Sequence, residues 1–288
     1  MIKTKLNSND ELPLTCSRRG TCCHGKIVRL NPWELKCLAE VKNLTPGKFR
    51  ELYCEYGGII LKFDGAAGWK NQPACSQYSG NSGCSVHGAR PLSCRLYPLG
   101  RKIQSGTSGY FYNGSEFPCL DGCPEVSGLP HLTVDEYLRG QNADRFETAQ
   151  DSYLELMQNI ADVAFMLLLD TGLAGSDNRE TLRLWRKAGS ESPAELAEHI
   201  GSEWVDFLMI PEISTDTGNP VSFIKKHYDL LQKKAQDNFE DLQTDNQFHE
   251  ASVLMMRLAL FLSHGIGADT EGLADHWVNT AKSHGAVD

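Results

Sequence analysis

The sequence lacks the motifs of the commonest enzyme classes. It has no Gly-x-x-x-x-Gly-Lys phosphate loop, no Gly-x-Gly-x-x-Gly dinucleotide motif and no Gly-x-Ser-x-Gly nucleophile elbow. The Cys-x-x-x-Cys-x-x-Cys triplet of radical S-adenosylmethionine enzymes is also missing, because Cys119 and Cys123 supply only its first half. The sequence therefore offers no familiar catalytic motif, and it leaves open whether the chain is an enzyme.

A long hydrophobic run is missing as well. The most apolar stretch, residues 160–169, contains Asp162 and is too short to cross a bilayer. The first residues carry positive charge, but no apolar segment of the kind found in secretory signal peptides follows them. We therefore expect a cytoplasmic protein without a membrane partner. Its 288 residues can bury enough apolar surface to fold without disulfides.

Cysteine is absent from residues 124–288, so all 10 cysteines lie in the first part of the chain. In a reducing cytosol such a group is more often metal-binding or catalytic than disulfide-bonded. Thiolates favour zinc and iron–sulfur clusters over magnesium and calcium. The sequence has no Cys-x-x-Cys knuckle of a structural zinc site, and its wide spacings favour an iron–sulfur cluster bound from several loops. The expected metal ligands are Cys16, Cys22, Cys23, Cys75, Cys84, Cys94, Cys119 and Cys123.

Two other cysteines and two histidines are not expected to be metal ligands. Cys37 and Cys54 lie in or near predicted helices, where a thiol acts as a small hydrophobic side chain, so we expect both in the core. His24 and His87 lie inside the cysteine motifs and could ligate zinc or a Rieske-type cluster. We expect both to lie at the surface or around the ligands instead.

Charge is divided as unevenly as cysteine. Residues 1–123 carry 16 Lys and Arg against 9 Asp and Glu, whereas residues 124–288 carry 12 against 28. A cluster held by thiolates adds negative charge, so Arg90 and Arg95 are expected to bind beside its sulfur atoms. The basic part lacks the interleaved aromatic residues of a nucleic-acid stacking surface, which disfavours nucleic acid. The acidic part suggests a protein partner. Further arginines that could offset the cluster charge are Arg18, Arg19 and Arg101.

Local patterns predict a mainly α fold, with a small irregular cysteine-rich α+β N-terminal half packed on a C-terminal helical bundle. Helix starts are predicted at Asn31-Pro32, Thr45-Pro46, Thr133 and Ser192-Pro193. Apolar helix faces are predicted within residues 154–168, 223–242 and 253–262. Strands are predicted at residues 27–30 and 59–63, with a hairpin of residues 102–104 and 110–112.

The pattern changes near residues 124–133, where Gly128 and Pro130 interrupt it. We therefore predict a cysteine-rich metal-binding region over residues 1–130 and an acidic helical region over residues 131–288. Aromatic residues have a predicted role in each of these two regions. Those expected to shield the metal centre are Tyr97, Tyr110, Phe111, Tyr112 and Phe117. Those that could line a binding groove among the helices are Trp185, Trp204 and Trp277.

The motifs around the cysteines resemble a known family. Cys16-Ser-Arg-Arg-Gly-Thr-Cys22-Cys23 and the later phrase Arg90-Pro-Leu-Ser-Cys94-Arg95 are similar to the YkgJ-like cysteine-cluster family, with its Cys-x-x-Cys-x-x-Cys-Cys start. The likeness covers roughly residues 13–125. The chain departs from the family at Arg19, which stands where the second cysteine of the motif would be.

The resemblance implies a zinc- or iron-chelating domain, and members are commonly described as iron–sulfur proteins. The first hypothesis is therefore a protein with an iron–sulfur centre, of the [4Fe–4S] type, for electron transfer, metal handling or support of a modification reaction. The second is a zinc-stapled module whose acidic helices bind a protein partner. The third rests on the family's relation to a flagellin lysine-N-methylase and is a protein-modifying enzyme with a lysine-rich substrate.

Overall fold

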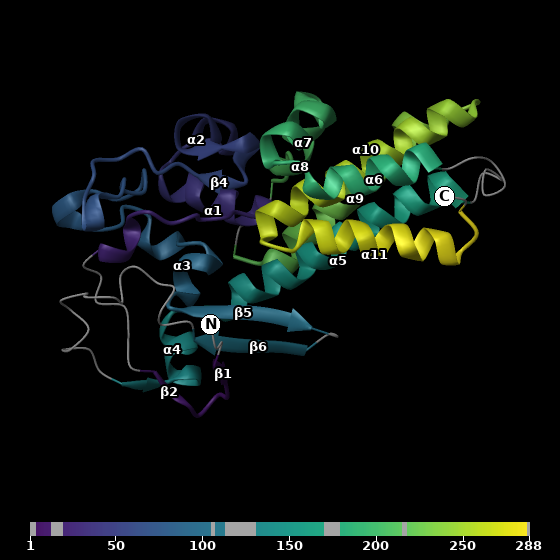
Figure 1. Ribbon diagram of the computed structural model, residues 1–288. Coiled ribbons are helices and arrows are strands. Elements are labelled where there is room, and N and C mark those ends of the chain that lie inside the picture. The colour runs from purple at the N-terminus through teal and green to yellow at the C-terminus, as the bar shows by residue number, and fades with distance from the viewer. Residues whose placement is uncertain are drawn as a thin grey trace.

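The computed structural model describes residues 4–12, 20–104, 107–112, 131–169, 179–214 and 218–286. Helices dominate this part of the chain, and the short strands all lie in its first half or just beyond it, as the sequence predicts (Figure 1). The strands within the described ranges are β1 (Thr4–Leu6), β2 (Glu11–Leu12), β3 (Cys54–Glu55), β4 (Ile60–Leu61), β5 (Leu99–Gln104), β6 (Thr107–Tyr112) and β7 (Leu132–Thr133).

The N-terminal helices begin where capping chemistry predicts. In α1 (Pro32–Val41) the Asn31 side chain accepts a hydrogen bond from the Glu34 backbone, and the Glu34 carboxylate accepts one from the Asn31 backbone. Thr45 caps α2 (Pro46–Tyr53) in the same way through its hydroxyl. The third N-terminal α-helix is the short α3 (Leu92–Leu96), and single 3-10 turns lie at Thr21–Cys23, Tyr56–Gly58, Trp69–Asn71, Gly80–Ser82 and His87–Ala89.

The strands form three small antiparallel sheets. The hairpin of β5 and β6 is longer than predicted, and β1 pairs with β6 to make the order β1-β6-β5. The other pairs are β2 with β7 and β3 with β4. The predicted strand at residues 27–30 is wrong, because only Arg29 forms a bridge there, to Ile60.

The second half of the chain folds as a helical bundle. Thr133 and Glu136 form the predicted capping box of α4, and Ser192 and Glu195 form that of α7. The helices are α4 (Val134–Gly140), α5 (Asp144–Leu169), α6 (Arg179–Ser190), α7 (Pro193–Ile200), α8 (Ser202–Met209), α9 (Pro220–Phe239), α10 (Asp245–Ile266) and α11 (Thr270–Ser283). Leu242, expected on the α9 face, lies beyond the end of that helix.

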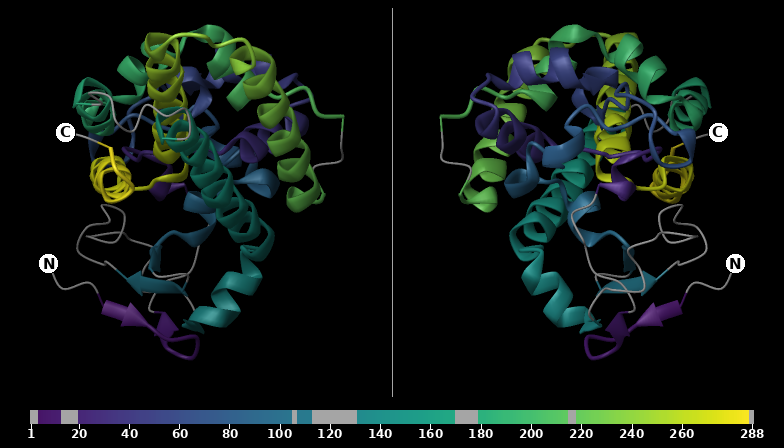
Figure 2. Two further views of the ribbon diagram at one scale, coloured as in Figure 1. Left: turned by 90° about the vertical axis from the view of Figure 1, so that its right-hand side faces the viewer. Right: turned by 90° about the vertical axis from the view of Figure 1, so that its left-hand side faces the viewer.

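Helix α5 joins the two parts of the molecule. It begins beside the sheet of β1, β6 and β5 and runs into the bundle, where it packs against α10 and α9 (Figure 2). Among the described residues it is the one helix long and apolar enough to cross a membrane by length and composition. Its buried residues follow one helix face, including Phe146, Tyr153 and Leu168, as expected for a helix inside a protein core.

The buried side chains of both parts form one hydrophobic core, which extends from Leu12 to Ala286. The three tryptophans expected to line a groove belong to this core. Trp185 is 0% exposed, Trp277 1% and Trp204 8%, so that prediction is wrong. Residues 113–130, across which the boundary between the two predicted regions falls, lie outside the described residues, and the division stays a prediction.

Candidate metal centre

The first two cysteines of the centre follow a left-handed glycine. Gly20 has φ 80°, and its carbonyl accepts a 2.8 Å hydrogen bond from the Cys23 backbone, which closes the turn that carries Cys22 and Cys23. A Cβ at position 20 would lie 2.1 Å from the Tyr78 ring. Glycine is therefore required here by both the backbone angle and the space.

Cys75 is brought to Cys23 by backbone pairing. His24 and Ala74 form an antiparallel bridge, and the Cys75 backbone donates a 2.8 Å hydrogen bond to the Cys23 carbonyl. Gly25 donates to the Pro73 carbonyl at 3.0 Å on the other side of the bridge. The two cysteines are thus neighbours in space although about fifty positions separate them in the sequence.

Two further contacts bring Cys84 and Cys94 to the same region. The chain turns back after Cys75, and Tyr78 forms an antiparallel bridge with Cys84. Cys94 lies on α3, whose first residue, Leu92, donates its backbone N–H to the Glu34 carboxylate at 2.6 Å. The capping residue of α1 therefore also fixes the helix that carries Cys94.

Mutual effects on thiol pKa values show that these five cysteines lie together. The pKa of Cys94 is raised to about 12, mainly by burial, and the charges of Cys75, Cys22 and Cys84 contribute to the rise. The pKa of Cys23 is raised by its hydrogen bond with Cys22, by burial and by the charges of Cys22, Cys94 and Cys84. Burial raises the pKa of Cys75, and the charge of Cys84 acts in the same direction. Charges interact this strongly only over short distances.

Cys22 is the thiol that the surroundings favour as an anion. The hydrogen bond from Cys23 lowers its pKa, and the positive charges of Lys26 and Arg90 act in the same direction against the effect of burial. The Lys26 Nζ also lies 2.7 Å from the centre of the Tyr97 ring. Lys26 was not among the residues predicted for the site; its place three residues after Cys23 was the available signal.

The donors present suit a soft metal. The seven described cysteines form no disulfide, and five of them approach one another from separate segments. Within the described ranges no three His, Cys, Asp or Glu side chains already have the spacing of a bound ion. Thiol donors of this kind match zinc and iron–sulfur chemistry rather than a hard cation. Cys16, Cys119 and Cys123, also expected as ligands, lie outside the described residues.

The two arginines predicted beside the cluster bind backbone carbonyls. Arg95 donates to the carbonyls of Arg90 at 2.7 Å, Gly88 at 2.6 Å and Gln141 at 2.5 Å. Its guanidinium carbon lies 3.8 Å from the centre of the Phe146 ring. Arg95 thus ties the loop between Cys84 and Cys94 to the segment joining α4 and α5.

Arg90 is held by the same segment. It donates to the His87 carbonyl at 3.1 Å and to the Gln141 side chain at 3.0 Å. From there its charge lowers the pKa of Cys22, as described above. Both arginines therefore lie at the cysteine loop, Arg90 with an electrostatic effect on a thiol and Arg95 with a positioning role.

Arg101 and Tyr110 serve the contact with α5 instead of the cysteines. Arg101 makes two hydrogen bonds to the Asp151 carboxylate, at 2.7 and 2.8 Å, and lies 3.5 Å from Glu147. The Tyr110 hydroxyl donates to Glu147 at 2.7 Å. The expectation that Arg101 offsets cluster charge is wrong because acidic side chains of α5 are its partners, and Tyr110 belongs to the same contact.

The remaining cysteines and histidines divide between core and site. Cys37 is 3% exposed and Cys54 7%, and both belong to the hydrophobic core. His87 is half-buried. His24 is not at the surface, because it is only 9% exposed and its Nδ1 lies 3.2 Å from the Gly20 carbonyl.

Comparison with known proteins gives one match. No curated protein and no solved structure matches the chain. The family model CxxCxxCC, described as a domain proposed to chelate zinc or iron, matches residues 15–111. This range contains all five of the clustered cysteines described above. Residues 15–111 of the chain are therefore similar to the CxxCxxCC family of zinc- or iron-chelating cysteine-cluster domains.

Proposed function

We propose that the cysteine centre holds an iron–sulfur cluster of the [4Fe–4S] type in a cytoplasmic protein. The observation that carries the proposal is the convergence of thiols from separate segments, seen in the mutual pKa effects of Cys22, Cys23, Cys75, Cys84 and Cys94. Such a spread suits a cluster, since each thiolate can bind a different iron atom. A single zinc ion takes about four ligands, fewer than the thiols available.

The residues around the thiols support a charged centre. Lys26 and Arg90 bring positive charge to Cys22, which offsets the negative charge that cluster thiolates accumulate. Arg95 fixes the loop between Cys84 and Cys94 through three backbone carbonyls, so two ligands are held at a defined separation. When bound, a cluster supplies one-electron transfer, and we propose that role for this domain.

Metal analysis of anaerobically purified protein tests the proposal. We expect iron and acid-labile sulfide in equal amounts, with broad visible absorption that bleaches on reduction. Zinc in a one-to-one ratio, without sulfide or colour, would show that the site is a zinc site instead.

A matched pair of variants tests the ligands. Cys94→Ala should lose the cluster, because it removes a thiol of the centre. Cys37→Ala removes a thiol that lies in the hydrophobic core, so its iron content should equal that of the wild type. Equal iron loss in the two variants would contradict the assignment of Cys94 as a ligand.

A second candidate function, a zinc-stapled module that binds a protein partner, is favoured by one surface of the bundle. A groove of about 540 Å³ runs between α5 and α9. Among the described residues, its apolar lining includes Val163, Met166 and Phe239, its charged residues are Asp162 and Glu240, and no Lys or Arg lines it. The shape and charge suit an amphipathic helix with a basic polar face.

Two designed peptides test this candidate. A Leu–Lys amphipathic helix of about 18 residues, long enough to be helical, should bind the full chain, and the matching Leu–Glu helix should not. Met166 is 51% exposed in the groove, so Met166→Lys should weaken binding of the Leu–Lys peptide about tenfold. Fluorescence anisotropy gives both affinities, and equal binding of the two peptides would refute the candidate.

A further inference from the structure

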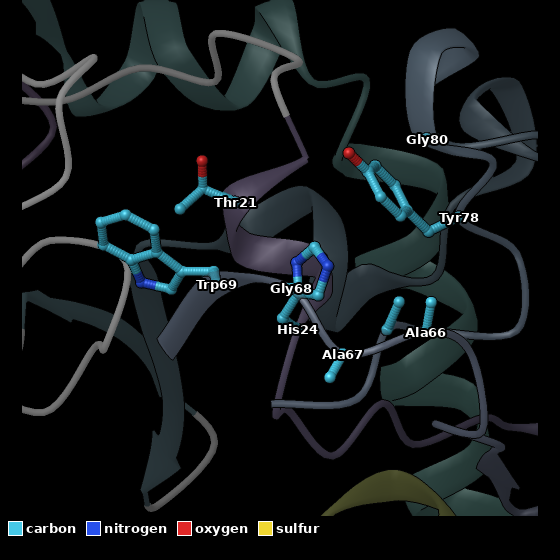
Figure 3. Close-up of a pocket in the computed structure, with 9 residues that line it drawn as sticks. Thr21, His24, Ala66, Ala67, Gly68, Trp69, Tyr78 and Gly80 are labelled. Carbon is cyan, nitrogen blue, oxygen red and sulfur yellow. The ribbon is translucent and has the colours of Figure 1, made fainter. Parts of the chain in front are cut away.

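A second cavity lies next to the cysteine centre. It has a volume of about 430 Å³, within the range of small-molecule sites. Figure 3 shows the His24 ring between Trp69 and Tyr78 in this view, with the alanines at positions 66 and 67 on the side away from the Tyr78 hydroxyl. The lining residues are Thr21, His24, Ala66, Ala67, Gly68, Trp69, Ala74, Tyr78 and Gly80.

The cavity and the thiols share one piece of backbone. His24 and Ala74 line the cavity and form the bridge described above, whereas their neighbours Cys23 and Cys75 belong to the centre. The cavity therefore adjoins the cysteine centre through the residues next to Cys23 and Cys75.

Two glycines give the aromatic rings room in the cavity wall. A Cβ at Gly68 would lie 2.2 Å from the His24 Nε2, and one at Gly20 would lie 2.1 Å from the Tyr78 ring. The His24 and Tyr78 rings meet edge to face, with their centres 5.1 Å apart. The wall thus depends on residues that have no side chain.

The hydrogen bond of His24 fixes the chemistry of its ring. A carbonyl oxygen only accepts, so the His24 Nδ1 that faces the Gly20 carbonyl at 3.2 Å carries a proton. In the neutral ring the lone pair then lies on Nε2. The residues that line the cavity therefore supply a nitrogen acceptor on His24 and the hydroxyl of Tyr78.

We infer that this cavity binds a small, neutral, planar aromatic molecule with hydrogen-bonding atoms on its edge. Within the described part of the chain no charged side chain lines the cavity, which disfavours an ionic ligand. The lining residues at positions 66–68 are small, and the neighbouring Trp69 offers an aromatic face on which a planar ring could stack. The inference does not depend on which metal the cysteines bind.

Lumiflavin, an uncharged three-ring compound with carbonyl groups, is a suitable probe. Stacking on Trp69 should quench its fluorescence in a saturable way when it is titrated with metal-loaded full-length protein. The phosphorylated analogue FMN should bind no more tightly, because no Lys or Arg is among the described residues that line the cavity. Absence of saturable quenching, or binding of FMN at least tenfold tighter than lumiflavin, would overturn the inference.

Matched glycine variants locate the bound probe. Gly68→Ala should weaken lumiflavin binding at least tenfold, because the new methyl group displaces His24. Gly140→Ala is the control, since a Cβ there meets nothing within 4 Å and Gly140 does not line the cavity. Trp69→Leu should also weaken binding at least tenfold and serves if Gly68→Ala fails to fold. Unchanged affinity in Trp69→Leu, with metal content intact, would place the probe elsewhere and refute the inference.

Discussion

The cysteine-rich part and the helical bundle are stabilised in different ways. In the bundle, helices bury whole apolar faces, so α10 alone carries thirteen buried residues, from Ala251 to Ile266. Around the cysteines the chain instead relies on single bridges, left-handed glycines and side chains bound to backbone carbonyls, as with Gly20 and Arg95. Burial of apolar side chains stabilises a fold without any ligand, whereas a site built from loops depends on its bound metal for stability.

Metal removal should separate the two parts most clearly. With a chelator under reducing conditions, amide exchange in residues 73–94 should rise about 100-fold or more, since metal-binding energy is folding energy there. Exchange in α10 should change less than about threefold. Hydrogen exchange read by mass spectrometry measures both, and equal acceleration throughout would mean that the two parts unfold together.

A cavity created by mutation in the bundle should lower the stability of the fold without changing metal binding. Leu258 is 0% exposed in α10, so Leu258→Ala should lower the free energy of unfolding by about 2–5 kcal/mol. Iron bound per folded molecule should not change. Urea denaturation and metal analysis check this, with Met166→Ala, at a 51% exposed position, as the control that should cost about 0.5 kcal/mol or less.

Glu34 should make the contact between α1 and α3 sensitive to pH. Its pKa is raised from 4.5 to about 7, because the effect of burial exceeds the opposing effects of the hydrogen bonds from Leu92 and Asn31 and of the charge of Arg95. The folded state then holds a proton that the unfolded state loses, so this contribution is full below pH 4.5 and is lost as pH rises through 7. Across that window, wild type should lose about 3 kcal/mol of stability relative to Glu34→Gln. Parallel stability curves for the two proteins, from urea titrations at each pH, would contradict the assignment.

The smallest effect is expected at a helix cap within the bundle. The Ser192 hydroxyl accepts from the Glu195 backbone at 3.3 Å and begins α7. Ser192→Ala should lower the free energy of unfolding by about 1 kcal/mol, while Ser192→Thr should keep most of the cap. Neither should change metal content or lumiflavin binding. A loss of iron from Ser192→Ala would mean that the bundle and the centre are more tightly coupled than their contacts indicate.

The sequence was most informative where the deciding contacts are local. Asn31, Thr45, Thr133 and Ser192 all cap helices as predicted, because the cap and its partner lie three residues apart. The apolar run at residues 253–262 is buried for a similar reason, since few polar residues interrupt it.

Predictions that required a distant partner were less successful. Residues 27–30 have the composition of a strand, but only Arg29 finds a bridge partner. Arg101 lies near the cysteines in the sequence, yet Asp151 of α5 is its partner. Trp185 could not be assigned to core or groove before the packing of its helix was known. The gathering of cysteines was predictable from composition, and their pairing through His24 and Ala74 was not.

That pairing limits how this part of the chain can change in length. Inserting or deleting one residue beside His24 or Ala74 would disturb the bridge and the hydrogen bonds from Cys75 to Cys23 and from Gly25 to Pro73. The backbone contact that brings Cys75 to Cys23 would then be lost. We therefore expect homologous chains to vary in length in other loops, and to keep residues 23–25 and 73–75 free of insertions and deletions.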